Sequence, residues 1–387
     1  MKPLRILIIT VLALFVNTAF AFDWKPQSNE TLRTDMIAFA RDFAQEAKGT
    51  KAGRMLKRFA RRQERLARTD DYVWITETHQ IVDKLKKMYP PQVDDGQFEA
   101  MMRRNTLRLL DYPLHFDNFA KTTAEGNEVF NTATNAYLDD ARQQVLQWLD
   151  QPKPEAGQLD ITLIYNMGVL IRSSEKTIAI DVRWDGTKEE AMKIAESIDM
   201  LFLTHPHNDH YSPVMLQAAV NAGKPVVLPC SLKNWTNDEA IVIDKELLQP
   251  KELDDVRICC LRGDQGEDIP NNVYLIEFNG WRILHQGDNA VWDIQTKLAE
   301  MPMADIIIAP SWNGIQHLLT PALKAQRYRG QGEPLFLPVH NNEMCHTVDH
   351  RESYWELFNR NDRLGNPDYH YPPFVLIDNG ERYIYQR

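Results

Sequence analysis

The stretch Leu203-Thr-His-Pro-His-Asn-Asp-His210 decides the fold and the chemistry of this 387-residue chain. It follows a short apolar run and holds three of the chain's 11 histidines within six residues. Imidazole and carboxylate are side chains that bind zinc in proteins. A loop after a buried strand can present His205 and His207 to one metal ion, and Asp209 and His210 to a neighbouring ion. Because histidine is scarce here, we predict a metal site rather than a polar loop with chance histidines.

Around this stretch, strand and helix signals alternate from residue 156 to the end of the sequence. Residues 159–171 predict a strand, residues 173–176 a turn, and residues 177–181 the partner strand. Residues 188–198 have the apolar spacing of a helix. Further short apolar runs predict strands over residues 200–203, 226–228, 257–261, 273–278, 281–285, 306–309, 336–339 and 374–377.

The His-x-His-x-Asp-His pattern resembles the signature of the metallo-β-lactamase superfamily, and three further features follow in that family's order. Asp181 closes a strand, as the family's first motif does. Asp288 follows Gly287 after an apolar strand, like the family's metal-bridging carboxylate. His340 ends the strand Phe-Leu-Pro-Val-His, like the last histidine ligand. The resemblance implies an α+β fold, the four-layer αβ/βα sandwich, and the apolar spacing of the preceding residues predicts an α-helical domain in front of it.

The resemblance covers roughly residues 159–385 and also implies a metal complement. It implies one or two Zn²⁺ ions, with Mn²⁺ as an alternative. The family expects another histidine between its second and fourth motifs, but residues 211–284 contain none. Asp264 is the expected substitute because carboxylate oxygen also binds zinc, Asp268 is the next candidate, and water is the third. The implied ligands are His205, His207, Asp209, His210, Asp288, His340 and Asp264.

These ligands imply a hydrolase. A bound metal ion lowers the pKa of water to about 7, and the resulting hydroxide attacks a carbonyl or phosphoryl centre. Asp209 and Asp288 are expected to be catalytic, and Trp312 and Asn313 to line the substrate pocket. The opening hairpin and the Pro-Val-His ending resemble the branch of L-ascorbate-6-phosphate lactonase and N-acylphosphatidylethanolamine phospholipase D. That branch implies a small-molecule or lipid-like substrate, either a phosphodiester or a lactone or ester.

The missing histidine also supports an alternative function. A site that has lost a ligand can decay into a non-catalytic metal-binding or ligand-binding protein. Metal content measured together with turnover separates this alternative from an enzyme.

The first 21 residues have the pattern of a signal peptide. Lys2 and Arg5 give a positive start, residues 6–16 are apolar apart from Thr10, and Ala19-Phe-Ala21 supplies small residues for cleavage. The apolar run is about half the length that a bilayer span requires. We therefore predict cleavage after Ala21, no transmembrane span in the mature chain, and an exported protein, periplasmic or secreted.

Residues 22–155 are expected to form an α-helical domain, and residues 156–387 the hydrolase domain. Helical spacing recurs over residues 32–43, 55–66, 73–88, 98–110 and 129–149, and residues 151–157 read as a linker. The net charge is −10, and the acidic excess lies in residues 156–387, so no nucleic acid partner is expected. Four cysteines are too few for a disulfide scaffold.

Overall fold

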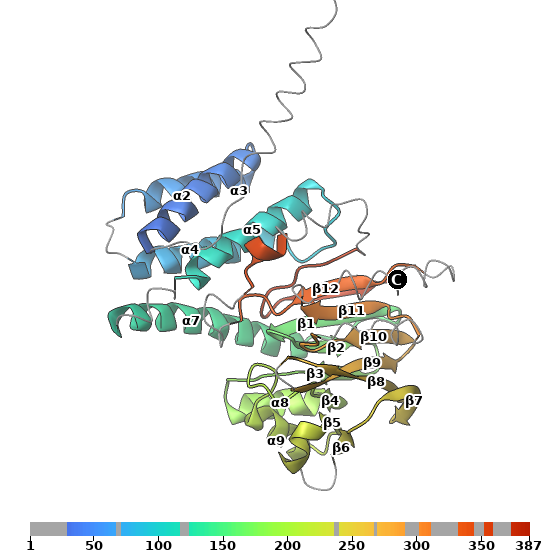
Figure 1. The fold of residues 1–387 in the computed structure, drawn as a ribbon. Helices are drawn as coiled ribbons and strands as arrows, with labels where there is room; N and C mark the ends of the chain where they lie inside the picture. The colour runs from blue at the N-terminus through green and yellow to red at the C-terminus, as the bar shows by residue number, and fades with distance from the viewer. Residues whose placement is uncertain are drawn as a thin grey trace, which may run out of the picture.

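The computed structural model describes residues 29–66, 71–116, 124–235, 240–266, 269–290, 302–310, 332–343, 352–358 and 373–387 (Figure 1). Its helices are α2 (Asn29–Glu46), α3 (Lys51–Gln63), α4 (Asp71–Met88), α5 (Phe98–Leu114), α7 (Ala124–Leu149), α8 (Lys188–Ser197) and α9 (Pro213–Asn221), with a short 3₁₀ helix, η1 (Cys230–Trp235). Its strands are β1 (Gln158–Tyr165), β2 (Gly168–Arg172), β3 (Thr177–Ile180), β4 (Met200–Phe202), β5 (Val226–Pro229), β6 (Ile241–Ile243), β7 (Leu247–Leu253), β8 (Val256–Asp264), β9 (Pro270–Phe278), β10 (Trp281–His285), β11 (Ile306–Pro310), β12 (Leu335–Val339) and β13 (Arg382–Gln386).

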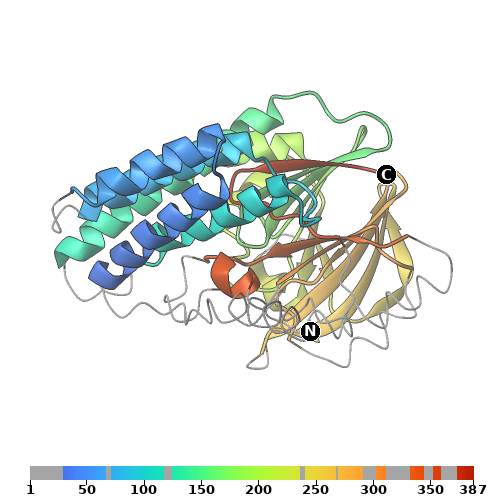
Figure 2. The ribbon, with the colours of Figure 1, turned by 90° about the horizontal axis from the view of Figure 1, so that it is seen from above.

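The N-terminal helices pack around an apolar core of their own. Leu32, Met36 and Phe43 recur at helical spacing on one face of α2 and are buried there. Thr50 caps α3 by accepting a hydrogen bond from the Gly53 backbone N–H at 3.0 Å. The helices gather on one side of the molecule and the strands on the other (Figure 2). The five helices expected from the spacing are confirmed; four extend beyond the expected bounds, and α3 begins and ends earlier than expected, at Lys51 and Gln63.

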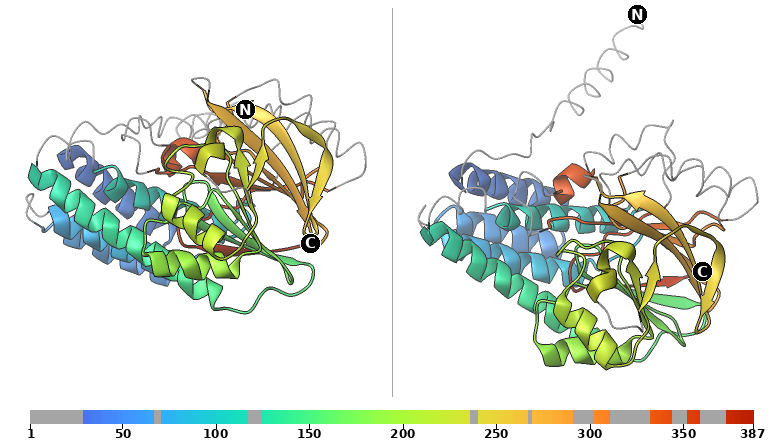
Figure 3. Two further views of the ribbon diagram at one scale, coloured as in Figure 1. Left: turned by 90° about the horizontal axis from the view of Figure 1, so that it is seen from below. Right: turned by 60° about the horizontal axis from the view of Figure 1, so that its bottom comes forward.

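Two sheets face each other across the main core of the second part. The first has the strand order β13-β1-β2-β3-β4-β5-β6 and the second the order β12-β11-β10-β9-β8-β7. Side chains from both sheets meet between them, for example Ile180 of β3, Ile258 of β8 and Ile276 of β9. On the outer face of the first sheet lie α8 and α9, which pack Ile194 and Met215 against it (Figure 3). This is the helical region followed by a two-sheet α+β domain that the sequence predicts.

Two of the strand predictions are wrong in detail. Residues 159–171 form two antiparallel strands, β1 and β2, because Asn166 has a left-handed φ of 53° and turns the chain. Residues 374–377 form no strand. Phe374 and Val375 make only isolated bridges, and the strand near the C-terminus is β13, which pairs with β1.

The core of the helices also takes in residues from near the end of the chain. Tyr354, Trp355, Leu357, Phe358 and Leu376 are buried in the same apolar cluster as α2, α4 and α5. The short helical turn of residues 354–358 lies beside α5 (Figure 1). Lys86 of α4 pairs with Asp378 at 2.7 Å, and Arg103 of α5 pairs with Glu381. The domain boundary predicted between residues 155 and 156 therefore stays a prediction. The N-terminal helices pack against residues that lie beyond this boundary in the sequence. No helix in the described part of the chain has the length and apolar character to cross a bilayer.

Candidate metal centre

The predicted metal loop lies where parallel strands end. The loop of residues 203–210 leaves the carboxyl end of β4, whose neighbours β3 and β5 run parallel to it. Its far end is fixed by α9, which begins with Pro213 in the first turn, and whose N-cap Ser212 accepts from the Met215 N–H. Asp288 follows β10 and His340 follows β12 in the other sheet. Two sheet edges thus bring residues far apart in sequence to one place.

Four side chains form a tight group, namely Asp209, His210, Asp288 and His340, and all four are buried. The Nε2 atom of His210 lies 3.1 Å from Asp288 Oδ2 and 3.4 Å from Asp209 Oδ2. The Nε2 atom of His340 lies 3.3 Å from Asp288 Oδ2 and 3.5 Å from Asp209 Oδ2. Ligand atoms about 2.0–2.1 Å from a tetrahedral zinc ion lie roughly 3.3 Å apart, so this spacing fits one ion.

A second group consists of His205, His207 and Asp288. His205 is buried, with Nε2 3.9 Å from Asp288 Oδ2, whereas His207 is half-buried on the outer side. The imidazole rings of His205 and His207 lie with their centroids 4.6 Å apart. Three protein ligands with an open position are typical of a catalytic metal site. Asp288 belongs to both groups and is therefore placed to bridge two ions.

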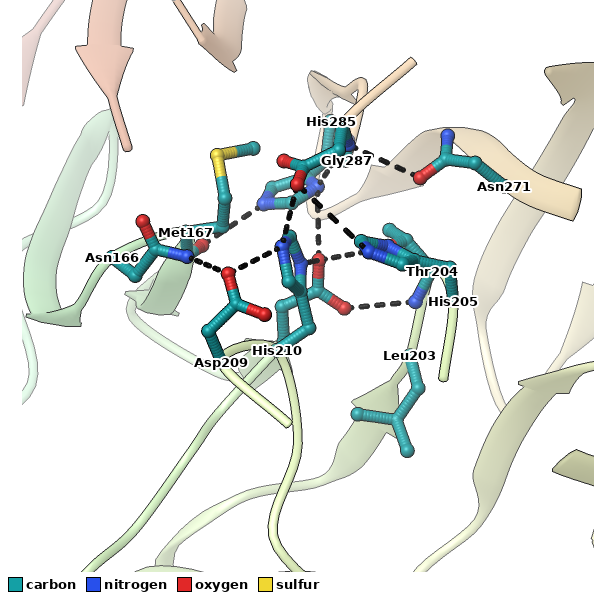
Figure 4. A network of polar contacts seen from close by, with 12 residues as sticks. Asn166, Met167, Leu203, Thr204, His205, Asp209, His210, Asn271, His285 and Gly287 are labelled. Carbon is teal, nitrogen blue, oxygen red and sulfur yellow. Dashed lines mark hydrogen bonds and ion pairs between the residues drawn. The ribbon is translucent and has the colours of Figure 1, made fainter. Parts of the chain in front are cut away.

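Asp181 orients two imidazoles, that of His210 directly and that of His205 through Thr204; Figure 4 shows His205, His210 and Thr204 close together. Its Oδ2 accepts from His210 Nδ1 at 2.9 Å and from the Thr204 hydroxyl at 2.7 Å. That hydroxyl oxygen in turn lies 3.1 Å from His205 Nδ1. With each Nδ1 held in this way, the Nε2 atoms of His205 and His210 are directed at the metal groups.

The turn that carries Asp288 is held by backbone contacts. Asn271 accepts from the Asp288 N–H at 3.1 Å and donates to the Gln286 carbonyl at 2.8 Å. His285 Nδ1 accepts from the Gly287 N–H at 3.2 Å, and its Nε2 lies 3.1 Å from the Met167 carbonyl. Both nitrogens of His285 are therefore used to hold backbone, which excludes it as a ligand in this arrangement.

Gly287 allows this turn, so Gly287→Ala is expected to weaken metal binding by about 10- to 100-fold. Its φ is +54°, and a Cβ there would lie 2.2 Å from Asn271 Oδ1 and 2.7 Å from Thr204 Oγ1. Gly280→Ala is the matched control, because Gly280 has a φ of +76° and nothing within 4 Å of a Cβ. Metal titration of both variants checks the prediction. Equal metal affinity in the two variants would contradict it.

The electrostatics of the centre favour a cation. Burial, together with the nearby His210, lowers the pKa of His205 to about 3. Burial would raise the pKa of Asp209, but His210 and His340 hold it well below its usual range. Burial would lower the pKa of His340, but Asp288 and Asp209 raise it to about 10. A divalent ion would neutralise the two carboxylates and leave the imidazoles neutral, as metal ligands must be.

The polar atoms that face the centre also fit a metal ion. His205 Nε2, His210 Nε2 and Asp288 Oδ1 are buried and have no hydrogen-bond partner among the residues that the structure describes. Buried polar atoms normally have such a partner, and a missing ion is one reason for an exception. The donor set of imidazole nitrogen and carboxylate oxygen suits zinc, manganese and iron.

Of the seven predicted ligands, six fall in the two groups. The side chain of Asp264 falls in neither, although its backbone N–H donates to Oδ1 of Asn289, the neighbour of Asp288, at 3.2 Å. Asp264 ends β8, and its Oδ1 accepts from the Gly266 N–H at 2.6 Å. Its side chain closes the tight turn between β8 and β9 and belongs to neither metal group. The predicted pocket residues Trp312 and Asn313, and the alternative ligand Asp268, lie outside the described residues.

The sequence analysis missed several residues that support the site. Asn166 donates to Asp209 Oδ2 at 2.8 Å, and Asn271 holds the Asp288 turn. Tyr165 donates to Glu343 Oε1 at 2.6 Å, just beyond His340. Asparagines and tyrosines carry no spacing signal of their own, so only the three-dimensional arrangement shows these roles.

Comparison with known families agrees with this geometry. Residues 160–325 match the family described as "Beta-lactamase superfamily domain". A metal-dependent hydrolase from Lysinibacillus sphaericus is 27% identical over 155 residues, which cover 37% of this chain and 68% of the relative.

Among solved structures, this chain is similar to a metallo hydrolase from Ignicoccus hospitalis, with 16% identity, a TM-score of 0.43, and coverage of 59% of this chain and 99% of the other. It is also similar to the metallo-beta-lactamase fold protein YhfI from Bacillus subtilis, with 13% identity, a TM-score of 0.41, and coverage of 59% and 99%.

The two facing sheets, with a His/Asp cluster at their meeting edges, define a metallohydrolase fold. With the match over residues 160–325, they make the second part of the chain a metallo-β-lactamase-like domain and the protein a metal-dependent hydrolase.

Proposed function

We propose that the protein uses one or two zinc ions, with manganese as an alternative, to hydrolyse a phosphodiester or a lactone or ester. The observation that carries the proposal is the group of four buried ligands, whose N···O separations of 3.1–3.5 Å suit a tetrahedral ion. When bound, the metal supplies hydroxide at neutral pH and stabilises the negative charge that develops during attack.

The residues around the metal centre then have different roles in binding and orientation. Asp209 and Asp288 bind metal and are placed to orient the attacking oxygen between the two groups. Asn166 fixes Asp209 by its hydrogen bond at 2.8 Å. Asp181 holds His210 in the tautomer that presents Nε2. The half-buried His207 marks the side from which a substrate can approach.

The substrate class rests on the resemblance of the opening hairpin and the Pro-Val-His ending to the lactonase and phospholipase D branch. β2 and β3 pair antiparallel on either side of residues 173–176, and His340 directly follows β12. These features support a small-molecule or lipid-like substrate. Metal ions at the site would offset the acidic charge of residues 156–387 and so allow an anionic diester to bind.

Metal removal tests the proposal. We expect the purified protein to hold one or two ions by elemental analysis and to hydrolyse bis(p-nitrophenyl) phosphate or an aryl lactone. Chelation should lower the rate by about 10³-fold or more, since the metal contributes several kcal/mol to the transition state. Added zinc or manganese should restore it.

Two results would overturn the proposal in different ways. Full activity of the metal-free protein would exclude the metallohydrolase mechanism. Tightly bound metal without turnover of any diester, lactone or ester would favour the alternative, a non-catalytic metal-binding protein. The observation that favours turnover is that the His205 group has three residues, of which His207 is half-buried.

Export is also part of the proposal. It is supported by the positive start, the short apolar run and the Ala-Phe-Ala sequence of residues 19–21. Mass spectrometry of the mature protein should find Phe22 as the first residue. Retention of Met1 in a membrane fraction would instead indicate an uncleaved anchor.

A further inference from the structure

Asp111, in the last turn of α5, contacts the segment that carries His340. Its Oδ1 accepts from Asn342 Nδ2 at 2.7 Å and from the Tyr354 N–H at 3.1 Å, and its Oδ2 accepts from the Trp355 N–H at 2.9 Å. The carboxylate is fully buried. One side chain of the N-terminal helices therefore holds the chain on both sides of residues 343–353, starting two residues beyond a predicted metal ligand.

The backbone after β12 needs such support. His340 has a φ of +69° and Asn342 a φ of +53°, both in the left-handed region. For a residue with a Cβ, this region costs energy and persists only where neighbouring contacts impose it. The contacts here are the His340 N–H to the Asn166 carbonyl at 3.3 Å, the Asn342 N–H to the Glu352 carbonyl at 2.7 Å, and the Asn342 side chain to Asp111.

A purely structural role does not account for a carboxylate at this position. Burial raises the pKa of Asp111 to about 8, although the Asn342 side chain and the backbone N–H groups of Trp355 and Tyr354 oppose that rise. An apolar residue would fill the same space in the α5 core without this cost. The carboxylate provides what an apolar residue lacks, which is three directed hydrogen bonds to one segment.

We propose that Asp111 is a positioning residue for His340. Through Asn342, it fixes the backbone that directs the His340 imidazole at Asp209 and Asp288. This inference rests on the proposed function, because it takes His340 as a metal ligand. It also makes the helices part of one metal site. His205 and His207 lie on the loop after β4 of the other sheet, and among the described residues the helices make no such hydrogen bond to that loop.

Cobalt(II) titration of the metal-free full-length protein tests the inference, because the visible spectrum of cobalt reports its ligands. We compare Asp111→Ala with Asn342→Gly, since glycine keeps a left-handed φ without steric cost. We expect the titration to show two cobalt-binding phases, one for each metal group. Both variants should lower the cobalt affinity of one phase by about 10- to 100-fold and leave the affinity of the other unchanged. His340→Ala and His207→Ala identify which phase belongs to which group.

Two further variants separate positioning from general destabilisation. Asp111→Asn combined with Asn342→Asp reverses the polar pair and should restore part of the lost affinity. Asn105→Ala removes a hydrogen bond of 2.6 Å to Glu46 of α2, on the same helix as Asp111. It should leave both cobalt phases unchanged even if the melting temperature falls.

The outcomes are distinct. An unchanged His340 phase in Asn342→Gly, or an equal loss in both phases, overturns the positioning role. Asn342→Gly decides the question if Asp111→Ala does not fold, because it removes one side chain and no buried charge. A wild-type protein that binds no cobalt would overturn the proposed function, and the positioning role would fall with it.

Discussion

Asp288→Ala is expected to remove the proposed metal, whether one ion or two, and to lower hydrolysis by about 10³-fold or more. Asp288 belongs to both metal groups. Its Oδ2 lies 3.1 Å from His210 Nε2, 3.3 Å from His340 Nε2 and 3.9 Å from His205 Nε2. Without this carboxylate, each metal group loses a negative side chain that would offset the charge of an ion. Loss of the metal forfeits several kcal/mol of transition-state stabilisation. Elemental analysis and turnover measured on the same sample check the prediction.

His207→Ala is the matched control, because His207 belongs to one group and is half-buried at its outer side. It should lower metal content by no more than one ion and leave the Asp209 and His340 group intact. Asp288→Asn keeps the shape of the side chain and tests charge alone. An Asp288→Ala protein that kept its full metal content would show that the carboxylate does not bridge.

The metal groups were partly predictable from sequence because four ligands lie within six residues. Asp288 and His340 lie far along the chain, and only the order of family motifs indicated them. Asp264 could not be excluded from sequence, because its position on β8 suits a ligand and the turn that captures its Oδ1 shows only in three dimensions. Asn166 was missed because its partner, Asp209, is 43 residues away.

In the fold, too, local patterns were predictable from the sequence and contacts between distant segments were not. Helical spacing located the N-terminal helices, since one apolar face each is enough to recognise them. β1 and β2 were read as one strand because nearly all their residues are buried on both faces, so no alternation marks the turn between them. The link between the helices and residues 354–358 was not foreseen, because it joins segments about 240 residues apart.

That link leads to the second large effect. Residues 156–387 alone are expected to lose cooperative folding. Without the helices, the fragment would expose five side chains that are now buried, those of Tyr354, Trp355, Leu357, Phe358 and Leu376. Each such burial contributes about 1.5–3 kcal/mol, so the loss is about 8–15 kcal/mol, as large as the whole stability of a typical domain. Asp378 and Glu381 would also lose their partners Lys86 and Arg103.

Cutting the chain without removing the helices provides the control. The linker around Lys153 is exposed, so a protease site can be inserted there and cleaved in the folded protein. The cleaved protein should keep its thermal transition and its metal, because the helices stay bound by packing and by the Lys86 and Arg103 ion pairs. The fragment expressed alone should instead aggregate or melt without a transition in circular dichroism.

A fragment that unfolds cooperatively and binds the same number of ions would show that the shared core is dispensable. The His340 group would then form without Asp111, so this result would count against the positioning role as well.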